Sequence, residues 1–185
     1  MKLRRLFAPF TGLLAGFLAV AVLVATPASA DTSPPPAPVA YEVFRFNRAT
    51  IEIMARNGVV AYAEGGTTRL DFHPLELVLT MPIVKTETGA GVFRTTIGGR
   101  MVFRNLRTGT SVGYELMHGN VSASLFITTN VDLPGAERVL FWVGGADENG
   151  VQPITLANRA LVEGPLATSV FPADYQVGTL RTVVP

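Results

Sequence analysis

After Ala40 the chain alternates short runs rich in valine, isoleucine, phenylalanine and threonine with glycine, asparagine, aspartate and proline. No window of about a dozen residues keeps apolar positions at the i, i+3, i+4, i+7 spacing of an amphipathic helix. Short runs of this composition, bounded by turn-forming residues, are typical of β-strands. We therefore expect an all-β fold with negligible helix: a single antiparallel β-sandwich or barrel of about nine to ten short strands.

Asn57-Gly58 is the strongest hairpin signal, because a type I′ turn needs a positive φ at both central positions. It predicts a hairpin over residues 50–64. Pairing Arg56 with Val59 then defines a core face made of Ile51, Ile53, Ala55, Val60 and Tyr62.

Gly98-Gly99 predicts a second hairpin over residues 91–106. A three-residue loop, with Gly99 left-handed in a G1 bulge, separates apolar from charged side chains better than a two-residue loop. In this register the buried face carries Phe93, Thr95, Met101 and Phe103. The outer face carries Arg94, Thr96, Arg100, Val102 and Arg104.

A third hairpin is predicted over residues 110–128, with His118 paired to Val121 across Gly119-Asn120. Its inward residues would be Val112, Tyr114, Leu116, Val121, Ala123, Leu125 and Ile127. Its outward residues would be Ser111, Gly113, Glu115, Met117, Ser122, Ser124 and Thr128, and Phe126 fits neither set. Further strands are predicted at Tyr41–Phe46, Thr68–Phe72, Glu76–Met81, Arg138–Val143, Pro153–Val162 and Gln176–Val183.

The first 30 residues have the pattern of a secretory signal peptide. A basic start precedes an apolar stretch from about Leu13 to Val24, and Ala28-Ser29-Ala30 offers small residues for cleavage before Asp31. The alternative is an uncleaved membrane anchor. Residues 31–40, with three successive prolines, predict an extended tether. We expect one β domain at 41–185, secreted or held at the cell envelope, with no membrane span after cleavage.

Charge and cysteine content exclude several classes of protein. Residues 1–30 hold three of the 15 Lys and Arg and none of the 14 Asp and Glu, so the rest carries 12 − 14 = −2. A chain of that charge has no bulk attraction to nucleic acid. With no cysteine, disulfides, thiolate metal ligands and cysteine nucleophiles are excluded, and the core alone must hold the domain.

Gly109-Thr110-Ser111-Val112-Gly113 matches the G-x-S-x-G pattern of serine hydrolases. A working nucleophile elbow is a strand-to-helix turn, whereas Ser111 is predicted inside a strand with no helix after it. Ser111 would also point outward and His118 inward. We therefore predict no catalytic role for this pattern.

The two histidines are the remaining candidates for polar chemistry. His73 lies beside Asp71 and Glu76, which predicts either a small polar site or a solvated turn. His118 and Tyr114 are four residues apart on one predicted face, roughly 13 Å along a strand. That separation is too long for one metal ion, but it suits the two ends of a flat ligand such as haem. The alternative is a core tyrosine and a histidine at a turn.

Asp147-Glu148-Asn149-Gly150 is rich in oxygen ligands for calcium but lacks the residue order of a calcium-binding loop. We predict a polar hairpin turn there, and no metal or cofactor.

The predicted arginine face is the strongest candidate for a binding surface. Arg94, Arg100 and Arg104 would project to one side of the second hairpin, with Arg107 near its end. Guanidinium groups match carboxylate, sulfate and phosphate. The alternative is a solvated sheet face paired with glutamates.

These observations favour an exported, non-enzymatic β domain with a binding or structural role at the envelope, contacting an anionic polymer or an envelope protein through those arginines. The alternative is a barrel that carries a small apolar or aromatic ligand, haem-like at the extreme. Its interior would be lined by Tyr62, Phe93, Phe103, Tyr114 and Trp142.

Overall fold

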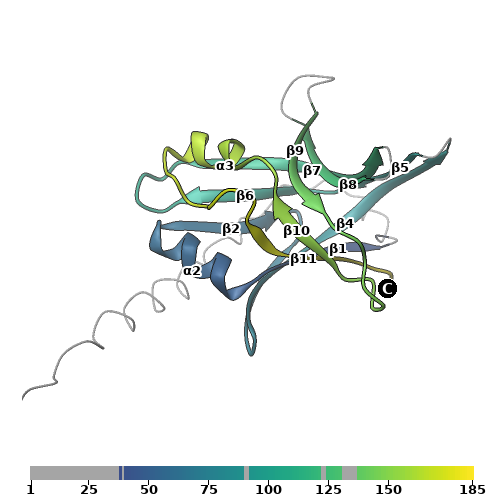
Figure 1. Cartoon of the computed structure of the whole chain (residues 1–185), viewed down its shortest axis with the longest axis horizontal. Coiled ribbons are helices and arrows are strands. Elements are labelled where there is room, and N and C mark those ends of the chain that lie inside the picture. Colours follow the sequence, from purple (N-terminus) through teal and green to yellow (C-terminus); the bar gives the residue numbers. More distant parts are fainter. Residues whose placement is uncertain (1–37, 39, 90–91, 122–123, 131–136) are drawn as a thin grey trace, which may run out of the picture. The chain divides into compact units, whose positions relative to one another are not determined.

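The computed structural model describes residues 38, 40–89, 92–121, 124–130 and 137–185. The predicted signal peptide 1–30 and nearly all of the predicted tether lie outside the described residues. The described part is mostly β, antiparallel, with two short helices (Figure 1). Its elements are β1 (Tyr41–Phe46), α2 (Arg48–Arg56), β2 (Val59–Glu64), β3 (Thr67–Phe72), β4 (Leu75–Gly89), β5 (Val92–Ile97), β6 (Arg100–Asn105), β7 (Ser111–Val121), β8 (Ser124–Asn130), β9 (Glu137–Val143), β10 (Gln152–Leu156), α3 (Arg159–Leu166) and β11 (Gln176–Val183).

Ten strands follow one path of hydrogen-bonded neighbours, β2-β6-β7-β5-β4-β1-β11-β10-β9-β8, and β3 joins the sheet at β4. Strand β8, at the end of this path, also pairs with β7. The pairings from β7 through β5, β4, β1, β11, β10, β9 and β8 therefore return to β7 and form a ring of eight strands. Strands β6 and β2 extend from β7 outside this ring.

Alternation along β1 shows how the ring is filled. Glu42, Phe44 and Phe46 are buried, while the residues between them are half-exposed. Phe44 and Phe46 each lie 6.4 Å from Phe141 of β9 between ring centroids, and Phe46 lies 6.5 Å from Phe103 of β6. Burying such rings contributes about 1.5–3 kcal/mol each. The core thus connects the ring to the outer strands.

The first predicted hairpin is wrong, because residues 48–56 form helix α2. Asn47 is its N-cap and accepts a hydrogen bond from the Thr50 amide at 2.8 Å. Asn57 ends the helix, and Gly58 follows with φ +70°. The residues that favour a type I′ turn also favour a left-handed helix terminus, so Asn57-Gly58 is ambiguous in the sequence.

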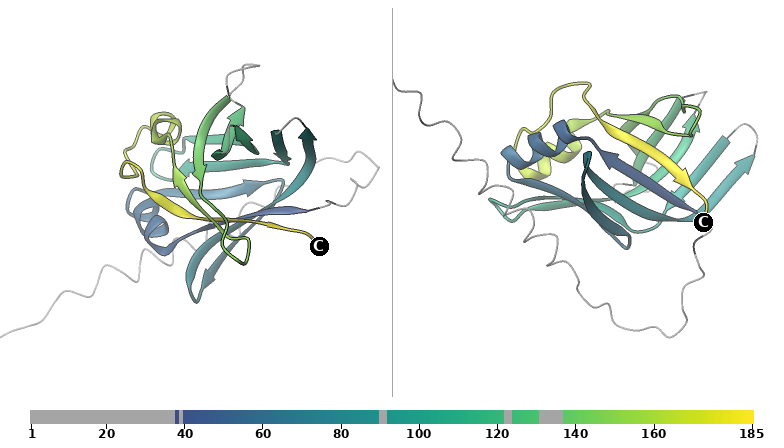
Figure 2. Two further views of the ribbon diagram at one scale, coloured as in Figure 1. Left: turned by 45° about the vertical axis from the view of Figure 1, so that its right-hand side comes forward. Right: turned by 90° about the horizontal axis from the view of Figure 1, so that it is seen from below.

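The predicted core face in β2 is only partly confirmed, because Val60 is buried as predicted but is not the main contact with the core. Val59 and Ala61 belong to the apolar core with Phe103, whereas Tyr62 is only half-buried. Both helices lie at one end of the domain and the C-terminus at the other (Figure 2).

The second predicted hairpin is wrong in its pairing. Strands β5 and β6 do not pair with each other; they lie end to end along β7, β5 against its second half and β6 against its first. Gly99 has the predicted positive φ, at +80°. Its role differs, because an ideal Cβ there would lie 2.0 Å from the Glu64 carbonyl oxygen. Gly99 thus permits close contact with the end of β2.

The predicted faces of this segment are partly confirmed. Thr95, Met101 and Phe103 are buried, and Arg100 and Arg104 are exposed. The prediction for Phe93 is wrong, since its side chain is 37% exposed, and so is that for Val102, which is buried.

The third hairpin exists as β7 and β8, with a different register. His118 pairs with Ile127 and Val121 with Ser124, so the chain reverses after Val121 rather than at Gly119-Asn120. Of the predicted inward residues, Tyr114 and Leu116 are buried and Val112 is half-buried against the core. Met117, predicted outward, is buried. The predicted faces of Val121 to Thr128 lie outside the described side chains.

The remaining strand predictions agree with the structure at β1, β3, β9 and β11, whereas the predicted strand Glu76–Met81 is too short, because β4 continues to Gly89. The predicted strand Pro153–Val162 is too long: β10 ends at Leu156 and helix α3 begins at Arg159. The α3 residues Leu161, Val162 and Leu166 are buried. A carboxylate oxygen of Glu163 accepts the amides of Val170 and Phe171, both at 2.7 Å, and holds the chain after the helix.

Candidate functional site

The four arginines predicted as one binding face occupy three different settings. Arg94 lies on β5 in register with Glu87 of β4 and is half-buried. Lys85 and, more weakly, Arg94 hold the pKa of the Glu87 carboxyl below its ordinary value. Arg94 therefore belongs to a charged array on the β4–β5 pair, across the Gly98-Gly99 junction from β6.

Arg107 has a structural contact. Its guanidinium donates to the carbonyl oxygen of Arg56, the last residue of α2, at 2.6 Å. A cation at a helix C-terminus meets unpaired carbonyls and the negative end of the helix dipole. This places Arg107 at the end of α2 rather than in the predicted face.

Arg100 and Arg104 remain together, on the outer side of β6, and we call them the β6 arginine pair. Arg100 donates to the Gly113 carbonyl at 3.2 Å, and its nearest carboxylate, Glu64, is 3.9 Å away. Within the described part of the chain, Arg104 forms no hydrogen bond or ion pair. Arg100 and Arg104 are therefore two exposed cations whose positive charges are only weakly balanced by nearby carboxylates.

Tyr62 lies next to this pair on β2, in register with Val102, which separates the two arginines. Burial raises the pKa of the Tyr62 phenol, and the negative charge of Glu64 raises it further. The charges of Arg104 and Arg100 lower this pKa. Both guanidinium groups therefore act on the Tyr62 phenol.

A pocket of about 400 Å³ opens beside Arg100. It lies where the strand ladder is interrupted: Thr96 pairs with Met117, and pairing resumes only at Met101 with Tyr114. Residues 97–100 and 115–116 fall between the two ladders. The pocket is lined by Thr96, Ile97, Gly99, Arg100, Glu115, Leu116 and Met117. We call it the junction pocket.

A buried histidine–carboxylate pair lies inside the ring. The Nδ1 atom of His118 is 3.1 Å from Oε1 of Glu42, and the side chains are 5% and 1% exposed. Thr182 donates to the same carboxylate oxygen at 3.0 Å. Oε2 of Glu42 and Nε2 of His118 are buried and have no hydrogen-bond partner among the residues that the structure describes. Phe93 packs edge-on against the imidazole, with ring centroids 6.1 Å apart.

His118 was a predicted candidate, whereas Glu42 was missed. Alternation in Tyr41–Phe46 places Glu42 on the same face as two phenylalanines, and this was the available signal. The contact itself joins residues 76 positions apart on strands that are not neighbours. Local patterns carry no information on such a pair.

Tyr114 and His118 are both buried on β7, on the inward face predicted for them. The Tyr114 hydroxyl donates to the Leu161 carbonyl of α3, so it anchors that helix. Ser111 is exposed at the start of β7, and the chain continues as a strand, which confirms its predicted placement.

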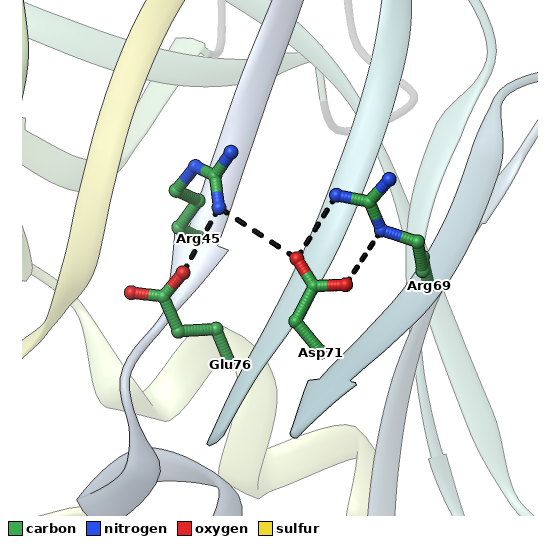
Figure 3. Close-up of polar contacts among 4 residues, drawn as sticks. All are labelled: Arg45, Arg69, Asp71 and Glu76. Atoms are coloured by element: carbon green, nitrogen blue, oxygen red, sulfur yellow. Dashed lines mark hydrogen bonds and ion pairs between the residues drawn. The ribbon is translucent and has the colours of Figure 1, made fainter. Parts of the chain in front are cut away.

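His73 is exposed in the turn between β3 and β4. Its predicted neighbours instead form an outer ion-pair network with two arginines (Figure 3). Arg45 lies 2.9 Å from Glu76 and 3.9 Å from Asp71, and Arg69 lies 2.7 Å from Asp71. Because these groups are partly exposed, each pair contributes about 0–1 kcal/mol. The network links β1, β4 and β3 and does not include His73.

The loop predicted as a polar turn is closed by one aspartate. A carboxylate oxygen of Asp147 accepts the amides of Asn149 and Val151, both at 2.8 Å. No cluster of three or more potential metal-ligating side chains occurs in the ranges that the structure describes. Across those same ranges, no helix is long and apolar enough to cross a membrane.

Comparison of the chain with protein-family models, with curated proteins and with solved structures found no match.

Proposed function

We propose that this chain is an exported, non-enzymatic β domain that binds an anionic group of a partner through the β6 arginine pair. One observation carries the proposal: Arg100 and Arg104 are exposed on one side of β6, and Arg100 borders a pocket of about 400 Å³. Pockets of about 300–1,000 Å³ are the usual size for small ligands or for one group of a larger partner.

The electrostatics of Arg100 support this role. Its distance of 3.9 Å to Glu64 is longer than the roughly 2.7–2.9 Å of a charge-assisted hydrogen bond. An exposed pair of this kind contributes about 0–1 kcal/mol. A carboxylate, sulfate or phosphate placed in line with the guanidinium would form shorter, bidentate bonds at little cost to the fold.

The proposal involves two arginines rather than four. Arg94 faces Glu87 on the neighbouring strand, and Arg107 is engaged at the C-terminus of α2.

The export component rests on the basic, apolar and small-residue pattern of residues 1–30. N-terminal sequencing of protein from the host's culture medium tests it: a chain beginning at Asp31 is expected, and a membrane-embedded chain beginning at Met1 would contradict it.

The binding experiment compares Arg100→Gln and Arg104→Gln with Arg48→Gln, an exposed arginine on α2 whose side chain is 74% exposed. Titration calorimetry with dextran sulfate and with poly-glutamate measures affinity at several salt concentrations. Each β6 variant should weaken binding by about five-fold or more and reduce its salt dependence, since exposed charges are screened over about 8–10 Å. Arg48→Gln should bind like the wild type. Equal loss in all three variants would show that only net charge matters and would overturn the proposal.

A carrier of a small ligand inside the ring is the second candidate. It is favoured by the strand pairings that return to β7 and by one polar atom each of Glu42 and His118, for which the described residues offer no hydrogen-bond partner. Against it, Phe44, Phe46 and Phe141 fill the ring between β1 and β9, and Trp142 is 49% exposed rather than interior. Native mass spectrometry of protein from its own host separates the two candidates, because a carrier would retain its ligand.

A further inference from the structure

The junction pocket carries two opposite charges that do not neutralise each other. Arg100 contributes a guanidinium from β6, and Glu115 contributes a carboxylate from β7. Glu115 is exposed and has no ion pair or hydrogen bond with any side chain that the structure describes. The nearest carboxylate to Arg100 is Glu64, not Glu115. An anion alone would meet Arg100 but would be repelled by Glu115.

Apart from these two charges, the pocket is lined by apolar side chains and by small residues. Met117 is buried and follows Glu115 by two residues on the same side of β7, and Thr96 pairs with it across the ladder. Ile97 and Leu116 complete the lining. A ligand that fills this space therefore needs an apolar portion beside its charged groups.

The backbone at the junction is held in place by two contacts. Gly99 has φ +80°, and the space that a Cβ would need is occupied by the Glu64 carbonyl. The Gly98 amide donates to the Pro82 carbonyl at 2.6 Å. These contacts fix the chain between the two ladders, so the pocket is already open without a ligand. A preformed site avoids the cost of ordering a loop on binding.

We propose that the junction pocket binds a zwitterionic ligand of about dipeptide size. Its carboxylate would lie against Arg100, its ammonium group against Glu115 and its apolar side chain against Met117. This inference rests on the proposed function, because it names the ligand class taken at the Arg100 end of the same surface. Two charge contacts of opposite sign also give a direction: the ligand's carboxylate end is toward β6 and its amine end toward β7.

The experiment uses L-alanyl-L-leucine, its N-acetyl form and its C-terminal amide, with affinity measured by NMR titration of the folded chain. The parent dipeptide should bind most tightly. Acetylation removes the charge that faces Glu115 and should weaken binding about five-fold, as expected for an exposed ion pair. Amidation removes the partner of Arg100 and should weaken it about ten-fold or more, as expected for a charge-assisted hydrogen bond. Binding of all three forms with equal affinity would overturn the inference.

Three variants locate the charges. Glu115→Gln should bind the parent and the acetylated form equally, and Arg100→Gln should bind the parent and the amide equally. Arg104→Gln, on the same face of β6 but outside the pocket lining, should retain all three preferences. Thermal melting confirms that each variant is folded; these are polar exchanges of exposed side chains, expected within about 0.5 kcal/mol.

The two proposals fail differently. If dextran sulfate binding depends on Arg100 and Arg104 but the dipeptide does not bind, the proposed function stands and the zwitterion inference is wrong. If the dipeptide binds with the predicted preferences but the polyanions do not bind, the pocket is a small-molecule site and the polymer-binding role is wrong. Absence of both kinds of binding overturns both proposals.

Discussion

At the scale of single residues, the Glu42–His118 pair is the polar contact that is most costly to bury. Both side chains have left water, and a buried ion or polar group is tolerated only where its hydrogen bonds are made. Glu42 Oε1 and His118 Nδ1 are paired with each other, whereas Glu42 Oε2 and His118 Nε2 have no partner in the described part of the chain. The pair is therefore sensitive to loss of either partner.

Glu42→Leu should lower the free energy of unfolding by about 3–5 kcal/mol, because it leaves a buried imidazole without its partner. The double variant Glu42→Leu with His118→Phe should cost less than the sum of the single variants, since no unpaired polar group remains. Chemical denaturation of the three proteins measures this coupling.

Glu76→Gln is the matched control for this cycle. It removes a carboxylate from the outer network with Arg45, where the Glu76 side chain is 25% exposed, and should cost within about 1 kcal/mol. Strictly additive effects of Glu42→Leu and His118→Phe would contradict the predicted coupling.

The Tyr62 phenol gives a second prediction at this scale. Burial and the charge of Glu64 raise its pKa above the ordinary value, and the charges of Arg104 and Arg100 lower it. Arg104→Gln should therefore raise the pKa further, and Glu64→Gln should lower it. Tyrosinate absorbance, taken as the difference from Tyr62→Phe, measures each value.

The raised pKa of Tyr62 also determines how its ionisation changes the stability of the fold with pH. As pH rises through about 10, the unfolded chain loses the phenolic proton before the folded chain does, so stability falls. Arg48→Gln, distant on α2, should leave the titration unchanged; a shift as large as that of Arg104→Gln would mean that Tyr62 senses only total charge.

At the scale of elements, the β5–β6 junction depends on two adjacent glycines with different constraints. Gly99→Ala must adopt φ +80° and meets a backbone oxygen, whereas Gly98→Ala meets the side chains of Val84 and Pro82. Val84 is 64% exposed and can move. Gly99→Ala should cost at least about 2 kcal/mol, from backbone strain and overpacking, and more than Gly98→Ala.

Urea denaturation of the two variants tests this order. The sequence pattern also assigned a left-handed conformation to Gly99, but in a hairpin loop rather than beside the end of β2. If Gly98→Ala lowers the free energy of unfolding more than Gly99→Ala does, the close contact between Gly99 and the end of β2 is not what makes position 99 intolerant of a side chain.

Elements bounded by unambiguous turn residues were predictable, whereas pairing between distant strands was not. The bounds of β1 and β11 follow from local alternation. Asn57-Gly58 was misread because one dipeptide serves both a hairpin and a helix end. Gly98-Gly99 was misread because β7, along which β5 and β6 lie end to end, enters later in the chain.

The candidate site was predictable to the same extent. The outward side chains of Arg100 and Arg104 follow from alternation, which is a local property. Recruitment of Arg107 to α2 and the opening of the junction pocket are tertiary properties. They depend on a helix that the sequence pattern did not indicate and on a break in a ladder that only the assembled sheet contains.

At the scale of the whole molecule, Phe46 connects the ring with the outer strands through Phe141 and Phe103. Phe46→Ala should lower the free energy of unfolding by about 3–5 kcal/mol, the usual loss for a core phenylalanine. Fluorescence of Trp142 on β9 and far-UV circular dichroism should show one coincident transition, because a shared core makes unfolding cooperative.

Phe72→Ala is the control, since Phe72 is 46% exposed on β3; its cost should be small by comparison. Two separated transitions in Phe46→Ala would mean that the ring and the outer strands fold independently.

The pairing of the first strand with the last has a consequence for how the chain reaches its folded state. Strand β1 pairs with β11 from Tyr41–Val183 to Phe46–Gly178, so the ring lacks one of its strands until the C-terminal segment has been synthesised. Contacts of such long sequence separation slow folding toward the millisecond-to-second range. The chain would therefore emerge from the ribosome without a closed ring, and the export proposed above would take place during this delay.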